Sequence, residues 1–462
     1  MNPLAAELNT IIENVNPHIL EMLSEMGKKL YFPKGILTQS AEAKQKAHKI
    51  NATIGIAKQN NRVMALPSIT ALINGIDPDN FLPYASSFGV PELREKWKNA
   101  LFQKNPSLVG KEISLPVVTG GITHSVSTFA DLWIDAGDTV ILPDMMWGNY
   151  SMTFGIRNRA KIVQYNTYTP DLKQMDIDSF ESTILRESSN NKKIVVLLNF
   201  PHNPTGYTLS VDEAKRVSSI LIGVAQHGSN VVVGCDDAYF GLFYEQETMK
   251  ESIFSLLTGA DKRLVAVKLD GATKEDYVWG LRTGFVTHGV GVDSDSPVAA
   301  SGCSCSSSSK KPSLSDLYFA LEKKTAGCIR GCISNASHLS QSVVLKSMED
   351  ENYPKYKQEK FDLLKTRALT IKEVLKDPVY SDAWDVYPFN SGYFMCIRLK
   401  DVDAETLRLH MLDNYGIGLI SIGKDNIRVA FSCLEQEQVK LLFDMVLQGV
   451  NELRKGNSNS SK

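Results

Sequence analysis

The sequence has no apolar run that approaches the roughly 18 residues needed to span a membrane. Its first residues, Met1–Leu8, also lack the basic region and the following apolar stretch that together form a secretory signal. These two absences argue against a membrane or secreted protein, and we expect a cytoplasmic location.

Neither sign of charge dominates the chain. It has 50 Lys and Arg residues and 52 Asp and Glu residues, for a formal net charge of −2. No basic arm or stripe is visible that would bind a phosphate backbone. We therefore expect no nucleic-acid partner.

Cysteine is scarce and odd in number. Seven cysteines in 462 residues, scattered through apolar segments, argue against a disulfide framework. Cys303 and Cys305 form a C-x-C pair that could bind a metal, but no second pair and no histidine cluster has a suitable spacing. The sequence therefore predicts no metal site.

From Leu115 onward, short β-branched runs alternate with helical patterns. Apolar runs of this length, separated by helix-sized intervals, indicate a mostly parallel sheet covered by helices on both faces. The sequence therefore predicts an α/β fold with a large domain of this kind. The runs are Leu115–Val118, Thr139–Leu142, Ile194–Leu198, Asn230–Val233 and Leu264–Val267.

Beyond about residue 340 the pattern changes to long charged helices, such as Tyr353–Val374, and then to two strand-like runs, 393–399 and 426–431. This pattern predicts a smaller α+β domain at 341–462, after a large domain at 61–340. Residues 1–60 are helical and polar, and we expect this segment to join the small domain.

Residues 293–311 are rich in serine and other small polar residues. Such a segment cannot bury enough apolar surface to order itself, so a solvated, disordered insertion is expected. A regulatory or localising role is the alternative.

The most informative feature is Lys274, which lies in Gly271–Lys274 and follows the apolar run that ends near Asp236. Pyridoxal 5′-phosphate needs a lysine amine to hold its aldehyde and a carboxylate to keep its pyridine nitrogen protonated. Lys274 and Asp236 can supply both groups. Both follow strand-like runs, where an open α/β sheet binds its ligands.

Three further motifs occur in order around these residues. Asn199–Gly206 contains N-P-T-G, Asp236–Tyr239 reads D-D-A-Y, and Arg282 follows Lys274 by eight residues. Together they resemble the class I/II aminotransferases of the aspartate aminotransferase fold, which are pyridoxal-phosphate enzymes. An N-P-x-G segment by itself is also a good turn sequence after a strand.

The resemblance implies a role for each of these residues. Asn203 would bind the cofactor's ring hydroxylate, and Tyr239 would donate a hydrogen bond to the same ring oxygen. Asp236 would pair with the pyridine nitrogen, although Asp237 is an ambiguous neighbour; successive strand residues point to opposite faces, so only one can reach the ring. Lys274 would be the cofactor's attachment point, with Asp236 and Tyr239 completing the catalytic set.

The cofactor's phosphate would lie against Arg282 and the turn Thr119–Ser125, which includes Gly121 and Ile122. Arginine binds two phosphate oxygens at once, and the N–H groups at a helix start favour an anion. Many relatives have serine three residues before the lysine. Here Gly271 stands in that place, which leaves Thr273 as a possible substitute.

Other matches concern the cofactor ring and the substrates. Trp147 resembles the aromatic residue that stacks on the cofactor, with a buried core tryptophan as the alternative. Arg428 aligns with the arginine that binds the α-carboxylate of the amino acid. Gly55 resembles the N-terminal segment that closes over the substrate.

Two residues resemble positions that act across a subunit boundary. Tyr84 would reach the neighbouring subunit's phosphate, which implies a homodimer. Arg330, four residues before Ser334-Asn335, would bind the distal carboxylate of an acidic substrate, although Ala336 replaces the proline that commonly follows.

The resemblance implies a two-stage transamination between an amino acid, acidic or aromatic, and a 2-oxo acid. Other reactions on the same scaffold, β-elimination of a sulfur substrate or decarboxylation, are the nearest alternatives, since the cofactor permits all of them. A non-catalytic binding protein with this fold is a more remote alternative.

Overall fold

The computed structural model describes residues 3–30, 58–59, 62–63, 75–292, 312–434 and 436–460. The predicted insertion at 293–311, with Cys303 and Cys305, lies outside the described residues, and so does Gly55. None of the described helices is both long and apolar enough to cross a membrane.

A seven-stranded sheet forms the centre of the large domain, and its strand order is β3-β9-β8-β7-β6-β4-β5. The five strands from β8 to β5 are parallel, whereas β9 is antiparallel to both of its neighbours. The prediction of a mostly parallel sheet is confirmed. The strands are β3 (Val117–Thr119), β4 (Thr139–Pro143), β5 (Lys161–Tyr165), β6 (Lys193–Asn199), β7 (Asn230–Asp236), β8 (Leu264–Asp270) and β9 (Gly284–Val290).

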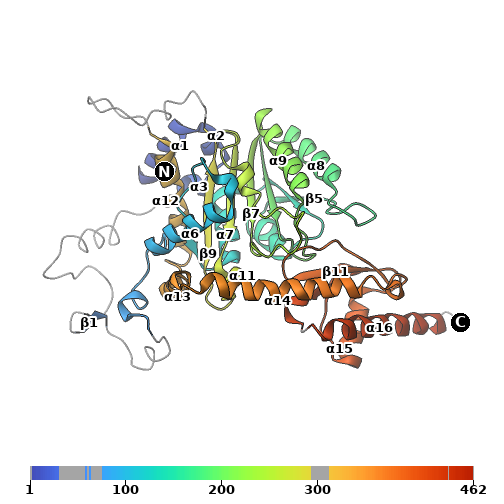
Figure 1. The fold of residues 1–462 in the computed structure, drawn as a ribbon. Helices are drawn as coiled ribbons and strands as arrows, with labels where there is room; N and C mark the ends of the chain where they lie inside the picture. The colour runs from blue at the N-terminus through green and yellow to red at the C-terminus, as the bar shows by residue number, and fades with distance from the viewer. Residues whose placement is uncertain are drawn as a thin grey trace, which may run out of the picture.

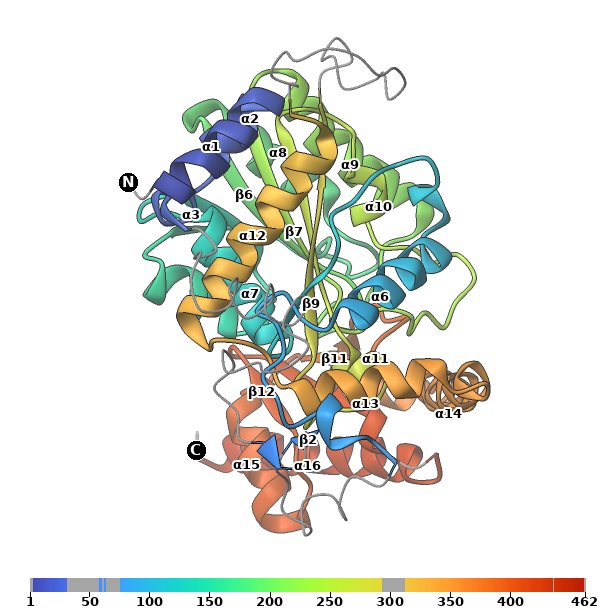
Figure 2. The ribbon, with the colours of Figure 1, turned by 90° about the vertical axis from the view of Figure 1, so that its left-hand side faces the viewer.

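Helices cover both faces of this sheet, as Figures 1 and 2 show. Successive residues of the buried strands join two different apolar clusters, because side chains alternate between the faces of a sheet. One face packs against α1 (Pro3–Val15), α7 (Ile122–Trp133) and α12 (Leu314–Cys332). The other packs against α6 (Pro91–Lys104), α8 (Ile177–Asn190), α9 (Val211–Gln226) and α10 (Phe254–Leu257).

A separate four-stranded antiparallel sheet, in the order β10-β11-β13-β12, forms the small domain. Its strands are β10 (Trp384–Val386), β11 (Phe394–Leu399), β12 (Ile420–Ile422) and β13 (Asn426–Ala430), with helices α15 (Ala404–Tyr415) and α16 (Gln438–Ser460). The long helix α14 (Tyr353–Val374) follows α13 (His338–Glu349) and runs from the large domain towards this sheet (Figure 1). The predicted fold class is confirmed.

The N-terminal helices do not pack as expected. α1, α2 (Pro17–Met22) and α3 (Glu25–Lys29) contact α12, β7 and α7 of the large domain, because their apolar faces complete its core. The expectation that this segment joins the small domain is therefore wrong for residues 3–30. The domain boundaries themselves stay predictions.

Several short elements complete the described chain. They are β1 (Lys58–Gln59), β2 (Arg62–Val63), α11 (Ala272–Glu275), the 3-10 helices η1 (Pro78–Asn80), η2 (Pro106–Leu108), η5 (Pro378–Tyr380) and η6 (Phe431–Cys433), and the π-helix η3 (Ser151–Arg157).

Candidate active site

A tight cradle forms where the start of α7 meets the loop before β9. Gly121 precedes α7 with a φ of 89°, a conformation that favours glycine. A Cβ on Gly121 would lie 2.8 Å from Nη2 of Arg282, so the guanidinium group packs directly on the turn. Ile122 begins α7, whose first N–H groups have no acceptor within the helix. This cradle suits an anion such as a phosphate group.

The same cradle explains why glycine occupies position 271. A Cβ there would lie 2.6 Å from the carbonyl oxygen of Thr283 and 2.8 Å from Cα of Gly284. A serine would clash with this backbone. Thr273, the possible substitute, is buried, and its hydroxyl donates a long hydrogen bond of 3.4 Å to the same Thr283 oxygen.

Lys274 lies in α11, directly after β8. Its Nζ lies 4.9 Å from the centre of the Tyr239 ring, and Tyr393 donates a hydrogen bond of 3.0 Å to its carbonyl oxygen. Burial lowers the pKa of Lys274, an effect that Asp236 opposes and Arg282 reinforces. A lowered pKa increases the fraction of the amine that is neutral, and the neutral form is the one that acts as a nucleophile or base.

Asp236 ends β7 and is 2% exposed. Its Oδ2 accepts a hydrogen bond of 2.6 Å from the Tyr150 hydroxyl, and its Oδ1 accepts one of 3.0 Å from the Ala238 N–H. Burial raises the pKa of Asp236, while Tyr150 and Lys274 lower it. A cationic partner would stabilise the charged form of so deeply buried a carboxylate.

Asn203 and Arg428 meet across the two domains. Nη1 of Arg428, on β13, donates a hydrogen bond of 3.0 Å to Oδ1 of Asn203, whose own N–H binds Oδ1 of Asn199. The guanidinium group lies 4.2 Å from the centre of the Phe394 ring, and its buried Nε has no hydrogen-bond partner among the described residues. Arg428 therefore retains donors for an anion.

Three of the predicted residues lie towards the edge of this site or on the surface. Trp147 is half-buried, with its ring edge-on to Tyr150 at a centroid distance of 5.6 Å. Tyr84 is 71% exposed. Arg330, in the last turn of α12, is exposed and donates a hydrogen bond of 2.6 Å to Oγ of Ser334.

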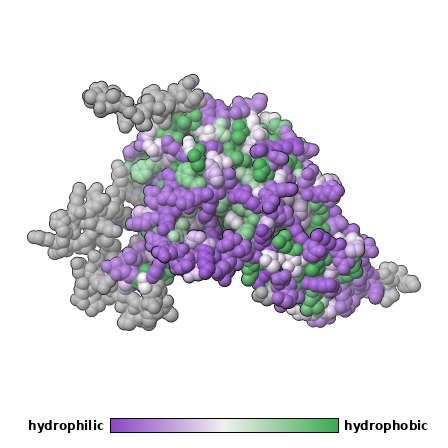
Figure 3. All heavy atoms as spheres, viewed as in Figure 1, coloured by the Kyte–Doolittle hydropathy of each residue, from purple (hydrophilic) through white to green (hydrophobic). Residues whose placement is uncertain are grey.

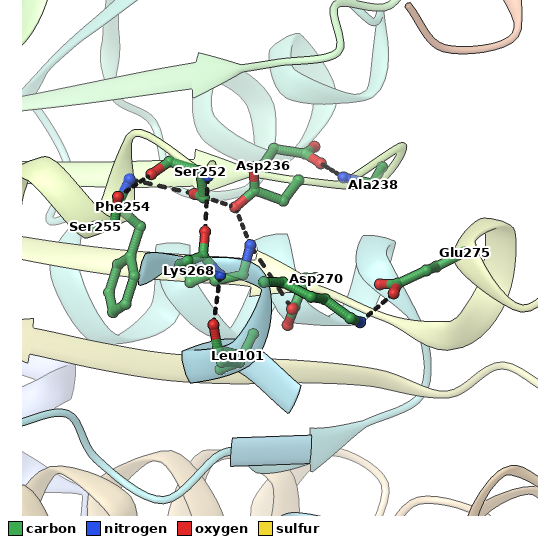
Figure 4. Close-up of polar contacts among 12 residues, drawn as sticks. Leu101, Asp236, Ala238, Ser252, Phe254, Ser255, Lys268, Asp270 and Glu275 are labelled. Carbon is green, nitrogen blue, oxygen red and sulfur yellow. Dashed lines mark hydrogen bonds and ion pairs between the residues drawn. The ribbon is translucent and has the colours of Figure 1, made fainter. Parts of the chain in front are cut away.

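A second charged group lies on the opposite face of the sheet. Lys268, which is fully buried, forms an ion pair with Asp237, and its Nζ lies 3.7 Å from Oδ2 of Asp270. Ser252 donates a further hydrogen bond of 2.6 Å to Asp237. In Figure 4 the Asp236 carboxylate turns towards Ala238 and away from Lys268.

Sequence reasoning missed two residues that support the site. Tyr150 reaches Asp236, as described above. His202 makes two hydrogen bonds: its Nε2 donates to the carbonyl oxygen of Met145 at 2.9 Å, and its Nδ1 accepts from Oγ1 of Thr205 at 2.7 Å. Burial lowers its pKa to about 4, so the ring is neutral and ties the Asn203 loop to the Trp147 loop. Its place directly before the N-P-T-G motif was the available signal.

Comparison with known families shows one that matches most of the chain. The family described as aminotransferase class I and II matches residues 47–446. The chain belongs to this family. Pyridoxal 5′-phosphate is the cofactor of class I and II aminotransferases.

Curated aminotransferases are similar in sequence to part of this chain. It is 28% identical over 212 residues to an aspartate aminotransferase from Sulfurisphaera tokodaii, a match that covers 45% of this chain and 48% of the relative. It is 24% identical over 258 residues to a probable N-acetyl-LL-diaminopimelate aminotransferase from Bacillus subtilis, covering 52% and 60%. The chain thus spans about half the length of the curated relatives it matches.

Solved structures share the fold over a larger share of the chain. An aminotransferase from Anaerococcus prevotii superposes with a TM-score of 0.69 at 22% identity, over 93% of this chain and 97% of the other. A Pyrococcus horikoshii kynurenine aminotransferase, whose structure contains PMP, superposes with a TM-score of 0.65 at 16% identity, over 83% and 85%. At these identities the likeness extends to the fold alone.

The residues present fit the family's cofactor. The glycine-lined cradle beside Arg282 suits the phosphate, and the buried carboxylate of Asp236 suits a cationic ring nitrogen. Lys274 follows β8 and interacts electrostatically with both Asp236 and Arg282. Its lowered pKa suits an amine that must bond to an aldehyde.

Proposed function

We propose that this protein is a pyridoxal-phosphate-dependent aminotransferase that moves an amino group between an acidic or aromatic amino acid and a 2-oxo acid. The observation that carries the proposal is the convergence of Lys274, Asp236 and Arg282 at the carboxyl ends of β7 and β8, with Arg428 contacting Asn203 beside them. Each of these groups supplies one of the contacts that transamination needs.

When bound, pyridoxal 5′-phosphate withdraws electrons from the substrate's Cα and makes its C–H bond acidic. Arg282 and the Gly121 turn hold the phosphate end, with Ile122 at the start of α7. Asp236, which accepts a hydrogen bond from Tyr150, would bind the protonated ring nitrogen. Asn203 and Tyr239 would bind the ring oxygen, and Trp147 would stack against the ring.

Arg428 binds the substrate α-carboxylate through its planar fork, a task for which lysine would be a poor replacement. This contact orients the substrate Cα–H bond towards Lys274. The neutral Nζ of Lys274 then removes the Cα proton and holds it for return in the next step. Burial lowers the pKa of Lys274 and so favours the neutral form of its amine.

Our proposal includes a cytoplasmic homodimer. The exposure of the Tyr84 ring, at 71%, supports a role for this residue in the neighbouring subunit's site. Unpaired thiols at Cys235, Cys328 and Cys396 support a reducing compartment.

The activity is tested by incubating the purified protein and its cofactor with glutamate or tyrosine. We expect the visible absorbance of the bound cofactor to change on addition of the amino acid and to return on addition of a 2-oxo acid, with the matching 2-oxo acid as product. Release of ammonia or carbon dioxide in place of that exchange would favour elimination or decarboxylation and contradict the proposal.

Substrate class is tested by two arginine substitutions. Arg428→Ala should weaken every amino donor, because all of them carry an α-carboxylate. Arg330→Ala should reduce kcat/KM by about 100-fold for aspartate or glutamate and spare tyrosine, since only an acidic side chain loses its charged partner. An equal loss for acidic and aromatic donors would remove the support for dicarboxylate binding by Arg330.

A further inference from the structure

The two residues that follow Lys274 both carry buried carboxylates. The side chains of Glu275 and Asp276 are 5% and 4% exposed. Acidic groups are almost never this buried without charged partners. Residues 274–276 are called the lysine turn below. Two lysines from other helices pair with its carboxylates: Lys104 at the end of α6 and Lys357 in α14.

Lys357 bridges the two carboxylates. Its Nζ lies 2.7 Å from Oε1 of Glu275 and 3.1 Å from Oδ1 of Asp276. Tyr353, one turn earlier on the same face of α14, donates its hydroxyl to the same Asp276 oxygen. α14 therefore contacts the lysine turn at two consecutive residues, Glu275 and Asp276.

The lysine turn is held on its other sides as well. Lys104 pairs with Glu275 from α6, and the Tyr393 hydroxyl binds the carbonyl oxygen of Lys274 itself. Figure 4 shows Glu275 on the turn that follows β8. The strand β8 itself carries Lys268 and Asp270. The backbone of Lys274 is thus fixed by contacts from both domains and from the helix between them.

We propose that Lys357, assisted by Tyr353, is a positioning residue for Lys274. By bridging Glu275 and Asp276 it fixes the backbone of the turn, so that the Lys274 amine returns to one place in each half of the reaction. This inference deepens the proposed function and rests on it. A displacement of about 1 Å of a reacting group can cost about 100-fold in rate, so a fixed backbone matters here.

The charges of this group balance, because two lysines face two carboxylates. Burial by itself would raise the pKa of Glu275, but Lys104 and Lys357 outweigh it and hold that pKa at about 2. The same carboxylates raise the pKa of Lys357. The Lys357–Glu275 pair therefore stays ionised near neutral pH.

Lys357 differs from Lys360 of the same helix. Hydrophilic residues predominate over the start of α14 in Figure 3, although Leu363 and Leu369 further along the helix are exposed. Lys360 is also an exposed residue of this helix. Lys360 lies three residues beyond Lys357 and provides a matched control: same residue type, same helix, but on the solvent side.

The test compares Lys357→Met, Lys357→Arg, Tyr353→Phe and the control Lys360→Met, each loaded with pyridoxal 5′-phosphate. Three quantities are measured: the melting temperature, kcat and KM for an amino donor, and the pH midpoint of the bound cofactor's visible absorbance. The midpoint reports the protonation of the Lys274 nitrogen, independently of turnover.

We expect Lys357→Met to lower kcat by about 10- to 100-fold with KM changed by less than about threefold, because substrate contacts remain. The absorbance midpoint should move to higher pH, since uncompensated carboxylates next to Lys274 favour its protonated form. Lys357→Arg should restore both values in large part, and Lys360→Met should match the wild type. Tyr353→Phe, a milder change, should shift both values in the same direction by a smaller amount.

A lower melting temperature with kcat and midpoint unchanged would overturn the proposal, since it would make the bridge merely structural. If Lys357→Met does not fold, Tyr353→Phe decides in the same way. A wild type that binds the cofactor without exchanging amino groups would instead contradict the proposed function.

Discussion

At the carboxyl ends of β7 and β8, two lysine–aspartate sets lie on opposite faces of one sheet, and their surroundings differ. Lys268 is fully buried and is held by Asp237 and Asp270. Burial would lower its pKa, but the two carboxylates outweigh that effect and raise it. On the other face, Lys274 and Asp236 influence each other without a direct ion pair, and burial lowers the pKa of Lys274.

This difference separates a structural lysine from a reactive one. The amine of Lys268 is protonated and fully engaged, so it can neither attack a carbonyl group nor accept a proton. The amine of Lys274 has a lowered pKa and an aromatic ring as its neighbour. Two residues of the same type, six positions apart, are therefore expected to respond to substitution in opposite ways.

The largest expected effect comes from substituting each of the two lysines separately. Lys274→Ala should lower kcat by about 10⁴-fold, the upper range for a lost general base, with little change in the free energy of unfolding. Lys268→Met should cost about 3–5 kcal/mol of stability, because it leaves buried carboxylates unpaired. Steady-state kinetics and urea unfolding measure both. The comparison fails if Lys268→Met, still folded, is the inactive variant.

The two aspartates provide the second test. Asp236→Asn should lower kcat by about 100-fold or more, because the ring nitrogen loses its charged partner. Asp237→Asn should mainly lower the free energy of unfolding, since Lys268 then loses its closest partner. Similar losses of kcat in the two folded variants would mean that the sheet face of the cofactor is assigned wrongly.

Tyr150→Phe should have a smaller effect, about tenfold in kcat, the value of one hydrogen bond to a charged group. The Tyr150 hydroxyl lowers the pKa of Asp236, so its removal raises that pKa. Since the carboxylate form exists only above the pKa, activity should be lost at a higher pH on acidification. A pH–rate profile that does not move would separate Tyr150 from the function of Asp236.

The smallest effect on catalysis is expected for Asp270→Asn, with kcat within about twofold of the wild type. Burial raises the pKa of Asp270 to about 6, although Lys268 opposes the shift. Because the folded state binds this proton more tightly than the unfolded state does, Asp270 stabilises the protein below pH about 4. This contribution to the free energy of unfolding is lost as the pH rises to about 6. The wild type should lose about 3 kcal/mol over this range relative to the variant. Parallel stability–pH curves would contradict the assignment.

The sequence predicted the parts of the fold whose signal is local. The five apolar runs correspond to β3, β4, β6, β7 and β8, and the bounds of α14 coincide with the predicted helix, 353–374. β5 and β9 were missed. β5 lies at the sheet edge with Lys161 exposed, and β9 is interrupted by Gly289 and polar residues, so neither reads as a continuous buried strand.

The candidate site follows the same rule. Lys274, Asp236, Arg282 and Asn203 lie in short motifs that can be found by spacing. Tyr150 and Lys357 could not be found in this way, because their partners lie 86 and 82 residues away. Position 271 shows the reverse case: its glycine looked like a missing phosphate ligand, whereas the Thr283 backbone leaves no room for a side chain.

The central claim is that Lys274, and not the buried Lys268, carries the cofactor. The most direct measurement is reduction of the pyridoxal-phosphate-loaded protein with borohydride, followed by digestion and peptide mass spectrometry. We predict the reduced cofactor on Lys274 in the wild type and its loss in Lys274→Ala. A label on Lys268, or a wild type that binds the cofactor without any labelled lysine, would contradict the account.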